Sequence, residues 1–192
     1  MGIAFCDHWK SSSVRPVQAR YTFFAKPMRI MHRAAGLLVL FLVPCGATSI
    51  GDRADKLVVN KSKRELLLNR SGKVIRSYRI ALGRNPVGPK LRKGDGKTPE
   101  GAYTISGRNA ASAYHRSLRI SYPNAADRIR ARRQGVDPGG DIMIHGLPNG
   151  QGFVGAAHRL IDWTDGCIAV TDAEIEEIWR LVPDGTPIQI NP

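Results

Sequence analysis

The pattern of hydrophobic and polar positions along the chain predicts a series of short β-strands. Segments 56–60 and 65–69 are strand-like, and the polar residues between them predict a hairpin. A turn at 69–72 then leads into a third alternating segment. The chain therefore opens as a β-meander, and the predicted strands are 56–60, 65–69, 74–82, 102–106, 118–121, 142–144, 168–170 and 187–190.

Two short helices are predicted among these strands. Asn124 is a suitable cap for a helix that runs to residue 133 and ends at Gly135. Thr171 and Glu174 form a capping box for a second helix that reaches about residue 182. Its predicted apolar face is Ile175, Ile178, Trp179 and Val182, with Trp179 as a core anchor. Because strands dominate, the predicted fold is mainly β, a sandwich or half-open barrel with a few short helices.

The apolar runs 142–144 and 168–170 carry the candidate chemistry. His145 ends the first run and Cys167 comes directly before the second. If the two strands are neighbours, the imidazole and the thiol meet at one end of the sheet. A thiol is a weak nucleophile until a base removes its proton, so this pair predicts an activated cysteine.

Glycines flank both residues. Gly146 leaves its carbonyl accessible to hold the His145 N–H and fix the tautomer. Gly166 allows a tight turn, and the amides of Gly166 and Cys167 are candidates for an oxyanion site. A lone cysteine in an apolar run also fits a small buried core residue, and spacing alone does not decide between the two interpretations.

The N-terminal region has the pattern of an export signal. Basic residues at 29 and 33 precede an unbroken apolar run, 34–43, and a small-residue segment, 44–49. Ten apolar residues are too few for a membrane span, which needs about 20. We therefore predict a signal peptide at 28–49, cleaved after 47 or 49, and a mature domain at 50–192. Residues 1–27 are interpreted as a non-native or unstructured extension, or as a long basic start of the signal. Acylation of Cys45 is an alternative that Pro44 disfavours.

Cleavage leaves one cysteine of the three, Cys167, so no internal disulfide is expected. An exported protein with a single thiol favours the catalytic interpretation. The chain carries a formal charge of +13, of which residues 1–49 contribute +5 (six Lys/Arg and one Asp), leaving +8 for the mature part. For an exported domain this charge suits the cell wall or a membrane surface better than nucleic acid.

Other polar residues are weaker candidates. His115 and His158 lack tight ligand spacing with His145 and Cys167, so no metal site is predicted. His158 is a candidate for substrate contact or a second base, with a surface position as the alternative. The basic loop 83–101 is either a solvated charge run or a rim that meets substrate carboxylates. The arginines of 128–133 lack interleaved aromatic residues and are interpreted as solvated.

The segment around Cys167 resembles the active-site signature of the YkuD-type L,D-transpeptidases, in particular a small YafK-like subgroup. The signature is His-Gly, a variable loop, and Ser/Thr-x-Gly-Cys, which correspond here to His145-Gly146 and Thr164-Asp165-Gly166-Cys167. Similar motifs lie upstream, so that the resemblance covers about 56–190 and includes 82–86, 94–103 and 121–124.

This resemblance implies an exported cysteine L,D-transpeptidase that acts on peptidoglycan stem peptides in the periplasm. Cys167 would attack the carbonyl between the third and fourth stem residues, and His145 would move the proton. No cofactor and no metal would be needed. The expected partners are stem peptides and a wall-anchored lipoprotein, with no nucleic acid, membrane contact only through the signal peptide, and a monomeric state. The predicted substrate-binding residues are Tyr122, Trp163, Thr164, Asp165 and His158. Trp163 with Asp162 is a candidate wall of the site, with a structural plug as the alternative for Trp163 and packing alone as the alternative for Tyr122.

Two positions depart from the common family pattern. Most transpeptidases of the family carry His before the Gly-Cys pair and Asn or Arg two residues after the Cys, whereas this chain has Asp165 and Ala169. Asp165 is expected to point away from the sulfur and to accept backbone hydrogen bonds in the turn. The departures leave a hydrolase of stem peptides or of the lipoprotein–peptidoglycan link as one alternative, and a non-catalytic wall-binding domain as another.

Overall fold

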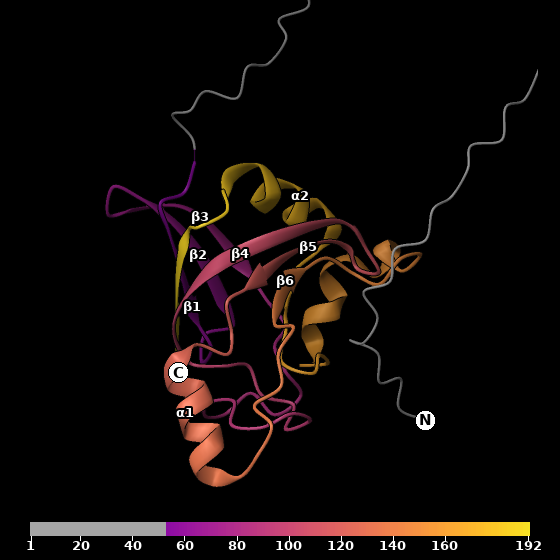
Figure 1. The fold of residues 1–192 in the computed structure, drawn as a ribbon. Coiled ribbons are helices and arrows are strands. Elements are labelled where there is room, and N and C mark those ends of the chain that lie inside the picture. The colour runs from indigo at the N-terminus through magenta and orange to yellow at the C-terminus, as the bar shows by residue number, and fades with distance from the viewer. Residues whose placement is uncertain (1–52) are drawn as a thin grey trace, which may run out of the picture. The chain divides into compact units, whose positions relative to one another are not determined.

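The computed structural model describes residues 53–192, and in this part of the chain eight strands form one mixed sheet (Figure 1). The strand order is β3-β2-β1-β8-β4-β5-β6-β7. The mainly β class expected from the sequence is therefore confirmed. The predicted extension 1–27 and signal peptide 28–49 lie outside the described residues.

One half of the sheet consists of the predicted meander and the C-terminal strand. The strands β1 (Lys56–Asn60), β2 (Glu65–Arg70) and β3 (Lys73–Arg79) pair antiparallel, and β8 (Pro187–Asn191) lies parallel to β1. Alternate side chains of β1 and β2 are fully buried, which is the period-two pattern that the sequence carries. β3 ends before the predicted residue 82, because residues beyond Ile80 leave β2 and pair with the other end of the sheet.

The strand β4 (Gly101–Ser112) joins the two halves. Its first residues, 101–104, pair with β8, and its later residues pair with β5 (His115–Ile120). The register shifts between Ile105 and Gly107, an irregularity that bends a strand. The sequence had placed only 102–106 in this strand, since the alternation fades where β4 continues into the β4–β5 hairpin.

The two ends of the sheet approach each other. β6 (Met143–His145) pairs with β5, and β7 (Ile168–Ala169) lies parallel to β6. Residues beyond β3 then form isolated bridges to the segment around β7, Ala81 with Ala169 and Gly83 with Thr164. The sheet is thus partly closed, which agrees with the predicted half-open barrel.

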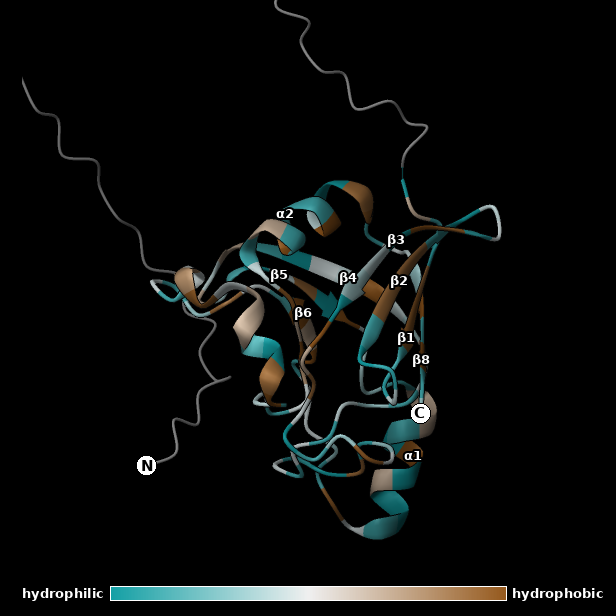
Figure 2. Cartoon of the chain, turned by 180° about the vertical axis from the view of Figure 1, so that it is seen from behind, coloured by the Kyte–Doolittle hydropathy of each residue, from teal (hydrophilic) through white to brown (hydrophobic). Residues whose placement is uncertain are grey.

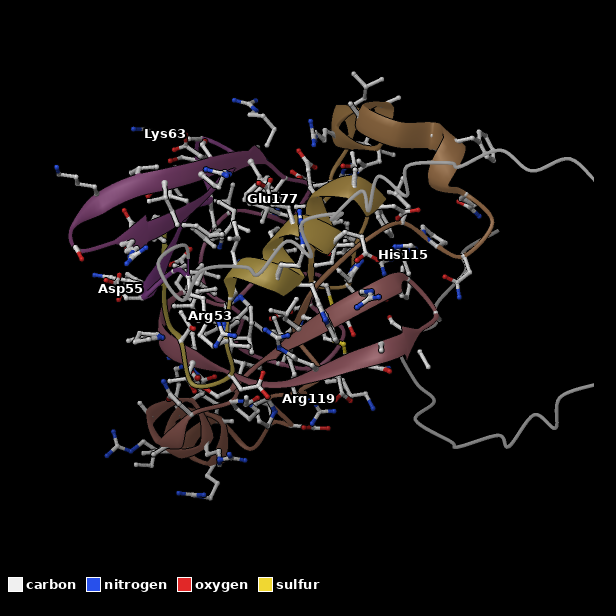
Figure 3. All side chains as sticks on the ribbon, turned by 90° about the horizontal axis from the view of Figure 1, so that it is seen from above. Arg53, Asp55, Lys63, His115, Arg119 and Glu177 are labelled. Carbon is white, nitrogen blue, oxygen red and sulfur yellow. The ribbon has the colours of Figure 1, made fainter. Side chains whose placement is uncertain are left out.

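The helix α2 (Asp172–Leu181) lies between the two halves of the curled sheet (Figure 3). Its capping box of Thr171 and Glu174 is the one predicted, and Ile175 and Ile178 are completely buried in the core. Trp179 is only partly buried and packs against the core, with the guanidinium groups of Arg108 and Arg116 over its ring at 4.8 and 4.9 Å. It anchors α2 to the β4–β5 hairpin rather than filling the core.

The other helical segments are α1 and η2. α1 (Ala125–Gln134) has the predicted cap, Asn124, and the predicted end, Gly135 at φ 64°. It is mostly hydrophilic and lies at the end of the sheet away from α2 (Figures 1 and 2). η2 (Gly152–Leu160), a 3-10 segment interrupted at Gly155, lies between β6 and β7, where the sequence had indicated only a Gly-rich loop.

Candidate active site

The predicted pairing of the two short strands around His145 and Cys167 is present. Ile144 pairs with Ile168 in parallel, so Cys167, one residue before Ile168, stands opposite Met143. Side chains two residues apart share a face, so His145 and Cys167 lie on the same side of the sheet. With a strand spacing of about 4.8 Å and a rise of about 3.3 Å per residue, their Cα atoms are about 8 Å apart. The pairing therefore brings the thiol and the imidazole to one face of the sheet.

Cys167 is almost inaccessible, with 3% of its surface exposed. Its Sγ atom donates to the carbonyl oxygen of Asp141 at 3.5 Å. Asp141 has a positive φ of 54°, and Arg119 holds its carboxylate at 2.6 Å. Positive φ is uncommon for residues other than glycine and is found at sites where the backbone is held in place. The segment before β6 therefore fixes the direction of the thiol.

His145 makes the hydrogen bond that the sequence predicted. Its Nδ1 atom lies 2.7 Å from the carbonyl oxygen of Gly146. A carbonyl oxygen only accepts, so Nδ1 carries the proton and Nε2 keeps a lone pair in the neutral ring. Nε2 is buried and has no hydrogen-bond partner among the described residues. The geometry leaves Nε2 as the basic atom of the site.

The surroundings of His145 keep the ring neutral. Tyr114 lies with its ring centroid 4.5 Å from that of the imidazole, and Trp163 lies at 5.7 Å. Burial lowers the pKa of His145 to about 4; the hydrogen bond to Gly146 acts in the opposite direction, and the charge of His158 adds to the lowering. Trp163 thus forms a wall of the site, as predicted. Tyr114 was not anticipated, because no local pattern in the sequence marks the residue at the tip of the β4–β5 hairpin.

The turn before Cys167 is held by Thr164. The Thr164 hydroxyl donates to the Cys167 carbonyl at 2.8 Å and accepts from the Gly166 N–H at 3.1 Å. Thr164 is buried and both its bonds lie inside the turn, so it supports the turn, a role that the sequence did not predict. The Gly166 N–H is already donated, which speaks against its predicted oxyanion role. The Cys167 amide remains the other predicted donor to the oxyanion.

Gly166 is needed for a different reason, the close approach of the loop 83–101. A Cβ atom on Gly166 would lie 2.5 Å from the Lys97 carbonyl oxygen, and its φ is 128°. A Cβ on Gly83 would lie 2.2 Å from the Gly96 carbonyl oxygen. The loop therefore packs backbone against backbone beside the catalytic turn, an approach that side chains would prevent.

Two of the five basic side chains in the loop 83–101 are paired with carboxylates, whereas Arg92 and Lys93 are exposed, as expected of a solvated run. Lys90 is buried and bonded to Asp95 at 2.8 Å, while Arg84 forms an ion pair with Asp165. The partner of Asp165 is this guanidinium, and not the backbone of the turn that was predicted. The positive charge of Arg84 offsets an anionic residue next to Gly166 and Cys167.

Two further predicted residues are buried. Tyr122 lies in the core, where its hydroxyl donates to the Pro138 carbonyl at 2.9 Å and its ring meets Tyr103 edge-on. It therefore supports the packing of the core. The surface position offered as the alternative for His158 is wrong, because this residue of η2 is only 6% exposed and Trp163 Nε1 donates to its Nδ1 at 3.5 Å. Its pKa is lowered, mainly by burial.

Neither a metal centre nor a membrane span is apparent in residues 53–192. No group of three or more His, Cys, Asp or Glu side chains in this part of the chain is arranged to hold a metal ion. None of its helices is long and apolar enough to cross a membrane.

Comparison with known families identifies the kind of domain that contains His145 and Cys167. The family model YkuD, described as the L,D-transpeptidase catalytic domain, matches residues 54–190. The chain belongs to this family. The chain is 27% identical over 179 residues to the "Putative L,D-transpeptidase YafK" of Escherichia coli (strain K12), covering 79% of this chain and 64% of YafK. It is also 27% identical to the like-named YqjB of Bacillus subtilis (strain 168), covering 70% and 69%.

Solved structures show the same YkuD fold. The helical cell shape determining protein Pgp2 from Campylobacter jejuni is 27% identical with a TM-score of 0.56, covering 71% of this chain and 46% of Pgp2. Bd1075 of Bdellovibrio bacteriovorus has a TM-score of 0.51 at 24% identity, covering 73% and 49%. The chain therefore spans less than two thirds of the length of YafK and less than half of that of Pgp2.

Proposed function

We propose that this YkuD domain is a cysteine acyl transferase that acts on peptidoglycan stem peptides, with Cys167 as nucleophile and His145 as base. One observation carries the proposal: the Gly146 carbonyl holds Nδ1 of His145, which leaves Nε2 basic on the same sheet face as the Cys167 thiol. A core cysteine needs no such arrangement. A wall-binding domain without catalysis needs neither the thiol nor the oriented imidazole.

The first half-reaction forms a thioester. Nε2 of His145 takes the proton of Sγ as the sulfur attacks the carbonyl carbon between the third and fourth stem residues. The C–S bond forms, and the C–N bond to the terminal D-alanine breaks. The imidazolium then gives its proton to the leaving amine. The Cys167 amide is the proposed donor to the oxyanion.

The second half-reaction releases the acyl group to an amine or to water. His145, neutral again after the first step, takes a proton from the attacking amine or water as the new C–N or C–O bond forms. The C–S bond then breaks, and the imidazolium returns its proton to the sulfur of Cys167. An amine of another stem gives a cross-link, a lipoprotein lysine gives an anchor, and water gives a shortened stem. Asp165 and Ala169, which replace the usual His and Asn or Arg, favour hydrolysis as the second candidate outcome. Pgp2 is named for a role in cell shape, and a remodelling enzyme of stem peptides fits such a role.

The substrate lies outside the cytoplasm, so the function includes export. The pattern at 28–49 supports it, and the mature N-terminus is expected near Thr48 or Ile50. N-terminal sequencing of protein from the cell envelope tests this, and intact residues 1–27 in that fraction would exclude it.

A purified tetrapeptide muropeptide tests the chemistry. The protein is mixed with this substrate, and mass spectrometry follows both the intact protein and the products. We expect an adduct on Cys167 with release of D-alanine, and neither in a Cys167→Ala control. An unmodified Cys167 together with unchanged muropeptide would contradict the proposed function.

A further inference from the structure

One peptide bond beside the active site is hydrogen-bonded at both ends. The carbonyl of Gly146 accepts from Nδ1 of His145 at 2.7 Å. The N–H of Leu147 belongs to the same peptide unit and donates to Oδ1 of Asp172 at 2.8 Å. A carboxylate is thus connected to the imidazole through a single peptide plane.

The space around the Asp172 carboxylate is built for it. A Cβ atom on Gly146 would come within 2.7 Å of Oδ1, and one on Gly152 within 2.5 Å of Oδ2. Two glycines from different segments, β6 with its following residue and η2, therefore leave room for the same side chain. Asp172 is also the first residue of α2, where the partial positive charge of the helix end favours an anion.

Support of α2 does not account for this contact. The capping box of the helix is completed by Thr171 and Glu174, whose side chains bond to each other's backbone amides. Oδ1 of Asp172 instead points outward from the helix to the Leu147 amide. The carboxylate is therefore directed at the segment that holds His145.

Several charged or titratable groups lie around the same carboxylate. His115 on β5 has its Nδ1 3.9 Å from Oδ2 of Asp172, and its Nε2 lies 2.8 Å from Glu176 (His115 is labelled in Figure 3). On η2, burial and the charge of Arg159 lower the pKa of His158, while the negative charges of Glu174 and Asp172 act to raise it. The charge of Asp172 therefore also acts on His158, whose own charge acts on His145.

We propose that Asp172 is a positioning residue that acts on His145 through the Gly146–Leu147 peptide. Accepting the N–H polarises this peptide and makes its carbonyl a stronger acceptor for Nδ1–H, since hydrogen bonds in a chain strengthen one another. This fixes the tautomer with a basic Nε2 and stabilises the imidazolium that forms when Cys167 loses its proton. In serine proteases a carboxylate does this by direct contact with the histidine; here the contact runs through the backbone.

The proposed role of Asp172 concerns the same acyl-transfer site, and only the kinetic part of its test depends on the proposed function. Asp172→Asn keeps an oxygen for the Leu147 amide but removes the charge, and Asp172→Ala removes both. Glu176→Gln is the matched control, because it removes a negative charge from the same helix, beside the same His115, without touching the 146–147 peptide. All variants are compared with the wild-type full chain, and thermal unfolding checks that they fold.

The primary readout is the ¹⁵N spectrum of His145. In wild type and Glu176→Gln we expect the pattern of an Nδ1–H ring with a strong hydrogen bond. Asp172→Asn should keep the tautomer with a weaker hydrogen bond and a lower pKa of His145, because the imidazolium loses a stabilising charge. Asp172→Ala should show mixed tautomers. The rate of Cys167 acylation should fall at least tenfold in Asp172→Asn and further in Asp172→Ala, with KM nearly unchanged.

The outcomes separate the two claims. If Asp172→Asn gives the same His145 resonances and titration as wild type, or if Glu176→Gln changes them equally, the positioning role is overturned. If the resonances change as expected while wild type itself never acylates, the positioning role stands and the proposed function fails. A folded Asp172→Asn protein keeps the test decisive even if Asp172→Ala does not fold.

Discussion

At the scale of single residues, Cys167 and His145 are expected to act as one unit. The thiol depends on Nε2 for loss of its proton, so Cys167→Ala and His145→Ala should each reduce acylation by roughly a factor of a thousand or more, and the double variant should add little. Mass spectrometry of the protein after incubation with a tetrapeptide muropeptide measures the adduct. The fold should persist in Cys167→Ala, because little buried volume is lost. Strictly additive losses would show that the two groups act separately.

The low pKa of His145 also predicts how stability depends on pH. In the folded protein its pKa is lowered to about 4, against an ordinary value of 6.5, so between these values the unfolded state binds more protons. Stability therefore rises with pH through this window and is lost as pH falls from about 6.5 toward 4, by about 3 kcal/mol at most.

Urea unfolding between pH 4.5 and 7.5 measures this dependence. His158 contributes in the same direction, because burial also lowers its pKa. His145→Gln is the control, since it keeps a polar side chain but cannot titrate. Parallel pH curves for His145→Gln and wild type would contradict the low pKa of His145.

The residue scale also shows what sequence reasoning reaches. The Gly146 carbonyl was predicted to hold His145 because both residues are adjacent in the chain and the requirement is local. Tyr114 and Asp172 were missed, because they reach His145 and its peptide from a hairpin tip and a helix start that lie about 30 residues away on either side. The hydrogen bonds of Thr164 within the turn were missed, because the sequence shows its motif but not its partners.

At the scale of elements, the turn 164–167 depends on one buried hydroxyl. Thr164→Val keeps the shape of the side chain but leaves the Gly166 N–H and the Cys167 carbonyl without their partner. A buried group left unsatisfied costs about 1–3 kcal/mol, so we expect a loss of that size in the free energy of unfolding. The acylation rate should fall as well, since this turn positions the nucleophile.

Thr104→Val on the exposed face of β4 is the matched control, with an expected effect within about 0.5 kcal/mol. Chemical denaturation of both variants gives the comparison. A Thr164→Val protein as stable as wild type would mean that water or a backbone shift replaces the hydroxyl, and that the turn does not depend on it.

Elements were predictable where their signals are local. The Asn124 cap, the Thr171–Glu174 capping box and the period-two strands of the meander follow from residues a few positions apart, and the structure has them. The length of β4 and the closure of the sheet were not predictable in detail. They depend on pairings between distant segments, such as Ala81 with Ala169, that no local pattern encodes. η2 was missed because its glycines indicate a loop and Gly155 does interrupt it.

At the scale of the whole molecule, the closure of the sheet bears on which acceptor, amine or water, receives the acyl group in the proposed mechanism. Ala169 is fully buried, and its backbone N–H and carbonyl both pair with Ala81. A larger polar side chain at 169 therefore has no room, and the closure of the sheet itself excludes the Asn or Arg found elsewhere in the family. Asp165 is half-exposed and paired with Arg84, so this position is open to change.

We predict that the acyl-enzyme of the wild-type protein reacts with water more readily than with an amine, and that Asp165→His shifts this partition toward the amine. Asp165 lies one residue before Gly166 and is paired with the guanidinium of Arg84. We expect this guanidinium, once released, to attract a carboxylate of the stem peptide. A histidine there releases Arg84 and adds a group that accepts the proton of an attacking amine.

Asp165→Asn is the control, since it releases Arg84 without adding a base. Deacylation is followed on a tetrapeptide muropeptide with and without an acceptor stem, as the ratio of cross-linked dimer to tripeptide. We expect a several-fold rise for Asp165→His and a smaller one for Asp165→Asn. Efficient dimer formation by the wild-type protein would show that Asp165 does not disfavour transfer and that hydrolysis is not its main reaction.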